Sequence, residues 1–242
     1  DGSFDPLISR GTSAFIISTA VDTSTDIISG TNFVTGLPED QSAYRSELAG
    51  IIGVLASVAV LVASYNIDSG SITIALDGES ALNESKGTWQ LQVSQPSFDY
   101  LQEIRNRIKA LPIQINWHWV RGHQKEQGIQ NLDWWAKMND LVDSNAKSYL
   151  ALCCQGTNPK PLTPVRLLFE KWAVSFNDKK LATLDKKALY KQLFYPRIKS
   201  YWESHHDFPI PSCEAIDWKP SQAALRQLPL GLKRWRWKFT TG

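Results

Sequence analysis

Hydrophobic and polar residues alternate in two stretches near the start of the chain. They are residues 11–20 (GTSAFIISTA) and 26–36 (DIISGTNFVTG), joined through the polar segment VDTSTD. A period of two is typical of strands that bury one face, so we predict two strands connected by a turn. The residues GSF at 2–4 are consistent with the end of an earlier strand.

A long apolar stretch with a helical pattern follows. We predict a helix over residues 42–64, and its second half is apolar nearly all round, as in helices buried on every side. A membrane span is the alternative, because residues 48–63 carry no charge. That run has 16 residues, fewer than the roughly 20 that a bilayer core requires, so we favour a buried helix and expect no membrane partner.

Strand and helix patterns alternate over the next 80 residues or so. SITIALD (71–77) and PIQINWHWV (112–120) are rich in strand-forming residues, whereas residues 97–111 and 131–154 repeat apolar positions at helical spacing. The order β, β, β, α, β, α, β, α predicts an α/β fold, with a mixed five-stranded sheet flanked by helices.

The composition changes after residue 154. The segment QGTNPKP is typical of a linker, and we therefore predict one domain over 1–154 and a second region over 155–242. For the second region we expect a short strand-like stretch at 166–176, helical pieces near 184–204 and a proline-rich stretch at 209–220. This describes a basic connector that is small and mainly helical.

Charge separates the same two regions. Residues 1–150 hold 10 Lys and Arg against 17 Asp and Glu, whereas residues 151–242 hold 16 against 7. A basic region can bind nucleic acid through its phosphates, and KRWRWKF (233–239) interleaves basic and aromatic residues as nucleic-acid grooves do. An amphipathic strand or a linker explains that segment equally well.

Cysteine usage indicates a reducing, intracellular setting. The chain has only three cysteines, Cys153, Cys154 and Cys213, too few for a disulfide framework and without a zinc spacing. Zinc at ESHHD (203–207) is disfavoured, because adjacent histidines rarely bind one ion. The chain starts at an aspartate and ends at KFTTG, and we interpret it as part of a longer polypeptide.

Four carboxylates stand at the ends of predicted elements or on their faces. They are Asp1, Glu47, Asp77 and Asp143. Like charges at neighbouring strand ends destabilise one another, and divalent cations remove that penalty. Oxygen ligands of this kind suit Mg²⁺, and a pair of such ions is the arrangement that a two-metal phosphodiesterase needs.

The motifs around these residues resemble the ribonuclease H family, in the form found inside retroelement polyproteins. DGS, SELAGI, LDGESAL, HWVRGHQ and NDLVDSNAK occur in the family's order over about residues 1–150. The resemblance implies an endonuclease that cuts the RNA strand of an RNA/DNA hybrid with two Mg²⁺ or Mn²⁺ ions. It also implies a partnership with the reverse transcriptase region of the same polyprotein.

The resemblance assigns roles to individual residues. Asp1, Glu47, Asp77 and Asp143 would be metal ligands and catalytic residues, and His123 would assist proton transfer and product departure. Asn139 and Asp140 match further family positions, and Ser3 lies where the family contacts the substrate or orients the first aspartate. By the same resemblance, Ser3, Gly78, Glu79 and Ser80 flank metal ligands where the ribose 2′-hydroxyl would be read. Asp133 competes with Asp143 for the fourth ligand, and we prefer Asp143 because Ala146 follows it at the family's spacing.

The two tryptophans of NWHWVRGHQ have a structural interpretation. Trp117 and Trp119 alternate along a strand, and we expect them to anchor it against the helices so that His123 reaches the site. Base stacking is the alternative.

Two other classes of function compete with the nuclease. A catalytically inactive module of the same fold would only bind nucleic acid, although the presence of all four carboxylates argues against it. In a structural or interaction protein the acidic pattern would be a coincidence, and the four carboxylates would not converge.

Overall fold

The computed structural model describes residues 1–19, 27–122, 124, 131–154, 167–170, 173–176, 179–184, 186–206 and 229. The chain divides into two compact units, Asp1–Leu184 and Asp185–Gly242. The first unit is a mixed α/β structure, and the described part of the second unit is a helix.

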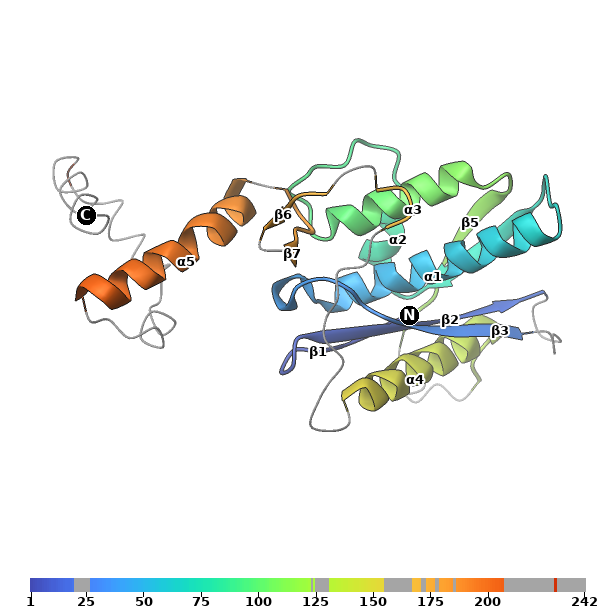
Figure 1. The fold of residues 1–242 in the computed structure, drawn as a ribbon. Helices are drawn as coiled ribbons and strands as arrows, with labels where there is room; N and C mark the ends of the chain where they lie inside the picture. Colours follow the sequence, from blue (N-terminus) through green and yellow to red (C-terminus); the bar gives the residue numbers. More distant parts are fainter. Residues whose placement is uncertain are drawn as a thin grey trace. The chain divides into compact units, whose positions relative to one another are not determined.

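Three antiparallel strands form the first sheet, in the order β1 (Gly2–Asp5), β2 (Arg10–Ser18) and β3 (Ile27–Phe33). The two predicted strands are confirmed, and GSF belongs to β1. The first half of β2 is buried, because helices cover both faces of this sheet (Figure 1). Its small residues allow a close approach on each side. Gly11 lies against Ser46 of helix α1 (Ala43–Ser64), and Thr12 donates to the Ala146 carbonyl of helix α4 (Trp134–Cys154) at 2.7 Å.

Helix α1 (Ala43–Ser64) follows a short 3₁₀ helix, η1 (Pro38–Asp40), and Ser42 caps it by accepting a hydrogen bond from Arg45 N. Its buried face packs in the main core with helix α3 (Phe98–Ala110). Arg45 is buried as well, and its guanidinium donates to both carboxylate oxygens of Asp99 at 2.8 and 2.9 Å. By length and composition α1 is the one described helix that could cross a membrane, but its buried positions are occupied by contacts within the protein.

Strands β4 (Ser71–Leu76) and β5 (Gln114–Trp119) form a second, parallel sheet. Helix α3 (Phe98–Ala110) connects them as expected, but a further helix, α2 (Glu79–Lys86), was not predicted. α2 has only eight residues, and few of them are apolar, so it lacks the long periodic pattern that identifies a helix in a sequence.

The prediction of one five-stranded sheet needs correction. The five strands are present, but they pair as β1-β2-β3 and as β4-β5. The described residues provide no strand that joins β2 to β4, so the hydrogen-bond ladder is interrupted there.

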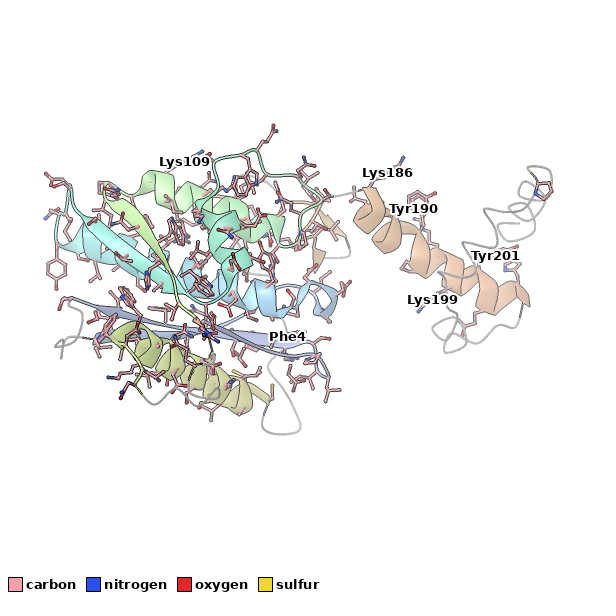
Figure 2. All side chains as sticks on the ribbon, turned by 180° about the vertical axis from the view of Figure 1, so that it is seen from behind. Phe4, Lys109, Lys186, Tyr190, Lys199 and Tyr201 are labelled. Atoms are coloured by element: carbon pink, nitrogen blue, oxygen red, sulfur yellow. The ribbon has the colours of Figure 1, made fainter. Side chains whose placement is uncertain are left out.

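Helix α4 (Trp134–Cys154) covers the face of the first sheet opposite α1 (Figure 1). Val142 and Ala146 pack against Ala14 of β2 in a second core cluster. Side chains fill the space on both faces of this sheet (Figure 2).

Described residues between 167 and 184 pack on helix α3. Leu168 N and Phe169 N both donate to Glu103 of α3, and Lys180 forms an ion pair with Asp99. Of the described residues in the predicted strand at 166–176, Ser175 and Phe176 form a strand, β6 (Ser175–Phe176), which pairs with β7 (Lys179–Lys180). The first compact unit therefore extends to residue 184, beyond the boundary proposed at residue 154.

The second unit contains helix α5 (Lys186–His206), in agreement with the helical pieces expected there. Lys186 and Tyr190 project from it in Figure 2. The proline-rich stretch, KRWRWKF and Cys213 lie outside the described residues.

Candidate metal centre

Three acidic side chains from separate parts of the chain meet at one point. Asp1 stands immediately before β1, Glu47 lies near the start of α1, and Asp77 follows the last residue of β4. One carboxylate oxygen from each lies within 4.8 Å of the other two. The C-terminal end of β4 therefore lies beside the N-terminal end of β1.

Glu47 has the most constrained environment of the three. Its Oε1 accepts a hydrogen bond from Gly2 N at 3.0 Å, while Oε2 is covered from solvent and has no hydrogen-bond partner. Burial raises the pKa of Glu47; the N-terminal ammonium and the Gly2 N–H lower it, and the neighbouring Asp77 and Asp143 carboxylates raise it. A buried carboxylate oxygen without a donor is costly unless a cation binds it.

Asp77 is held from three directions. Asn139 Nδ2 donates to Asp77 Oδ2 at 3.2 Å, and the indole of Trp119 donates to the Asp77 carbonyl at 3.0 Å. Gly122 lies so close to Asp77 Oδ2 that a Cβ atom at this position would collide with it. Asn139 therefore orients the carboxylate, Trp119 fixes the main chain of Asp77, and Gly122 leaves room for Oδ2.

Asp143 lies beside the three-carboxylate group without entering it. It lines a small cavity together with Asp1, Asp77, Arg121 and Asn139. Its Oδ2 accepts a hydrogen bond from Lys147 Nζ at 2.6 Å, one turn further along α4. The structure therefore places Asp143 next to the other three carboxylates, with a cation of the protein as its partner.

Asp133, the competing fourth ligand, has a local role. Its Oδ1 accepts from Ala136 N at 2.7 Å, and its carbonyl accepts from Lys137 N. A carboxylate that satisfies the first N–H groups of a helix is a helix cap. This contact favours Asp143 over Asp133 as the acidic side chain of α4 at the site.

Other residues singled out in the sequence differ in their outcome. His123 lies outside the described residues. Ser3 is buried under α1, where its carbonyl accepts from Ser46 Oγ, so its side chain is not presented to a substrate. Glu79 and Ser80 are exposed on the first turn of α2, directly after Asp77.

The two tryptophans of β5 lie in different environments. Trp117 packs against the main core as predicted. Trp119 is 51% exposed, so the prediction that it anchors the strand in the core is wrong. Its position at the last residue of β5 places the indole N–H over the Asp77 carbonyl instead, a contact that strand alternation alone does not reveal.

The donor set fits a hard divalent cation. Carboxylate oxygens suit Mg²⁺, Mn²⁺ and Ca²⁺, whereas the described part of the site offers no thiolate or imidazole that would favour a softer metal. Glu47 Oε2 has no hydrogen-bond partner, and the neighbouring carboxylates repel one another. A bound cation would relieve both penalties. The three residues could hold a metal ion.

Comparison with known proteins adds no relative. A scan against protein-family models gives no match, and a search of curated proteins gives no match.

Proposed function

We propose that the chain is a metal-dependent endonuclease that hydrolyses the RNA strand of RNA/DNA hybrids. The observation that carries this proposal is the convergence of Asp1, Glu47 and Asp77, with a buried carboxylate oxygen that has no partner. The order of the motifs around these residues, which resembles the ribonuclease H family, supports the same function. The resemblance also makes the reverse transcriptase region of a retroelement polyprotein the expected partner.

The residues that would hold Mg²⁺ or Mn²⁺ are Asp1, Glu47 and Asp77, and Asp143 is the candidate for sharing a second ion. When bound, such ions supply positive charge that stabilises the developing charge on phosphate oxygens and lowers the pKa of water. The protein contributes carboxylates fixed on a helix and at strand ends, which hold their positions better than residues on loops.

Neighbouring side chains would prepare the site for this chemistry. Asn139 and Trp119 fix the orientation of Asp77 by the hydrogen bonds described above. Gly2 N donates to both Asp1 Oδ1, at 2.5 Å, and Glu47 Oε1, so one amide orients two carboxylates. Arg121 lines the same cavity, and guanidinium groups are suited to phosphate oxygens.

The preference for a hybrid would come from contacts to the ribose. The 2′-hydroxyl is the group by which a protein distinguishes RNA from DNA at a given site. Gly78, Glu79 and Ser80 follow Asp77 directly, and the last two are exposed, so they are the candidates for contact with a ribose next to the cleaved phosphate. The basic residues after 154 would add affinity through phosphates without discrimination.

The decisive experiment is cleavage of an end-labelled RNA/DNA hybrid with Mg²⁺ and with EDTA, beside the matching DNA duplex. We expect Mg²⁺-dependent cuts in the RNA strand only. Binding of the hybrid without cleavage would favour an inactive nucleic-acid-binding module. Equal cleavage of both duplexes would indicate a DNA nuclease.

A further inference from the structure

Helix α5 (Lys186–His206) carries a line of aromatic and basic side chains along one side. Its members lie three or four residues apart, at Tyr190, Phe194, Arg197, Tyr201 and His205. The 3.6-residue repeat of a helix places residues at this spacing on one face, which we call the α5 stripe. Figure 2 shows Tyr190 and Tyr201 on the same side of the helix, whereas Lys199 projects from the opposite side.

The rings of the α5 stripe form two stacked pairs. The ring centroids of Tyr190 and Phe194 are 4.4 Å apart, with the planes tilted by 30°. Those of Tyr201 and His205 are 4.2 Å apart, with the planes at 20°. Tyr190 is 51% exposed and Phe194 is 40% exposed, so the first pair retains ring surface for a further planar group.

The charge of α5 indicates an anionic partner. The 21 residues of the helix include five Lys and Arg and a single acidic residue, Glu203. Arg197 is exposed between the two ring pairs, and Lys186 is exposed one turn before Tyr190. Association of this face with a second copy of itself would bring like charges together, which is unfavourable. The α5 stripe is therefore complementary to a polyanion.

The distribution of apolar residues decides between two polyanions, a membrane and a nucleic acid. A helix that lies on a membrane gathers its apolar residues on one face, whereas those of α5 are spread around its circumference. Aromatic rings interleaved with cations suit a single nucleic-acid strand, because each unpaired base offers a face for stacking and each phosphate attracts a cation. In a duplex the base faces are covered by their neighbours.

We propose that the α5 stripe binds an unpaired strand of RNA or DNA, with bases stacked on its rings and phosphates held by Arg197 and Lys186. This gives the second unit a preference for unpaired over paired strands, which the proposed nuclease activity does not include. The argument rests on α5 alone, so it holds whether or not the acidic centre is catalytic.

The test measures binding by the full 242-residue chain in EDTA, where metal-dependent cleavage cannot occur. The probes are labelled single strands of RNA and of DNA of about 16 nucleotides, the matching DNA duplex, and vesicles that contain phosphatidylserine. We expect the single strands to bind about 10-fold more tightly than the duplex. A preference between RNA and DNA would identify the natural strand, whereas equal or tighter binding of the duplex would overturn the proposal.

A double variant removes the exposed ring pair. Tyr190→Leu with Phe194→Leu keeps apolar side chains and helix propensity but removes the surfaces for stacking. We expect single-strand binding to weaken by about 10-fold or more, while Tyr65→Leu, at an exposed tyrosine after α1, leaves it unchanged. Wild-type strand binding by the double variant would overturn the proposal. Loss of vesicle binding with strand binding retained would assign the stripe to membranes instead.

A second pair of variants tests the stripe through charge. Arg197→Gln and Lys199→Gln each remove one positive charge, from opposite sides of α5, and glutamine preserves helix propensity. We expect Arg197→Gln to reduce the slope of log K against log salt by about 0.7, as for one lost phosphate contact, and Lys199→Gln to leave the slope unchanged. Equal slopes would mean that net charge alone attracts the strand. A wild-type dimer that the double leucine variant dissociates would show that the stripe binds a second copy, and either result would overturn the proposal.

Discussion

Glu47 and Glu103, on the packed helices α1 and α3, show how differently a folded chain can treat the same side chain. Glu103 of α3 is 2% exposed and has three donors: Arg107 Nε at 2.7 Å, Leu168 N at 3.1 Å and Phe169 N at 3.0 Å. Glu47 of α1 has one donor and a covered oxygen with none. The neighbours of Glu47 include two further carboxylates.

The difference in hydrogen-bond donors makes Glu103 a structural carboxylate and Glu47 one suited to binding a cation. Glu103 is compensated within the protein, and it ties the segment after the linker to α3. Glu47 is left with repulsion and an unmet hydrogen-bonding capacity, which folding alone does not repay. Such a residue is retained at a cost to stability, and a bound cation is the compensation that its environment allows.

The largest expected effect tests whether the acidic centre acts chemically. Asp77→Asn should lower Mg²⁺-dependent cleavage of the hybrid by about 10³-fold or more, because the amide is nearly isosteric but supplies no negative charge to a cation. The matched control is Asp68→Asn, which changes an exposed aspartate of the loop before β4. Circular dichroism should show both variants folded, and a wild-type rate for Asp77→Asn would remove this residue from the site.

The same isosteric change at Glu103 tests whether this carboxylate stabilises the fold. Glu103→Gln replaces one acceptor with a donor that faces N–H groups, and removes the charge that balances Arg107. We expect the free energy of unfolding to fall by about 2–4 kcal/mol. Urea denaturation measures it, and the exposed Glu39→Gln serves as control. An unchanged stability would mean that Glu103 is not the anchor of residues 168 and 169.

At Glu47 the identical substitution should act in the opposite direction. Glu47→Gln removes one of several neighbouring negative charges, so without metal the free energy of unfolding should rise by about 1 kcal/mol. The increase in thermal midpoint that Mg²⁺ gives the wild type should be lost. If Mg²⁺ stabilised Glu47→Gln and wild type equally, the acidic centre would not be the metal site.

Periodicity was sufficient to predict most of the fold. The strands of the first sheet, α1, α3, α4 and the pair β4 and β5 all carry long or clearly alternating patterns. The short helix α2 was not predicted because eight mostly polar residues give no period. Among the described residues of the strand expected at 166–176, Leu168 and Phe169 form no strand, because their N–H groups turn back to Glu103.

The candidate site was predictable in its residue types and less so in its contacts. Strand ends and a helix start identified Asp1, Glu47 and Asp77, because the ends of neighbouring elements meet. Helical periodicity could not reveal that Glu47 has a single hydrogen-bond donor whereas Glu103 has three. Which donors surround a carboxylate depends on long-range contacts, such as the one between Gly2 and Glu47.

Asp143 combines features of these two glutamates, because it lies beside the acidic centre yet has a cationic partner in the protein. The smallest expected effect tests whether it takes part in metal binding. Its partner Lys147 is 52% exposed, so the ion pair contributes about 0.5 kcal/mol or less, and Lys147→Gln should leave stability nearly unchanged. Removing the ammonium should nevertheless raise the affinity for Mg²⁺ by about 2- to 5-fold, because Asp143 becomes a better partner for a cation. Titration of Mg²⁺ monitored by thermal midpoint measures this, with the exposed Lys137→Gln of the same helix as control. Equal affinities in the two variants would place Asp143 outside the metal centre and leave the three-carboxylate group to bind alone.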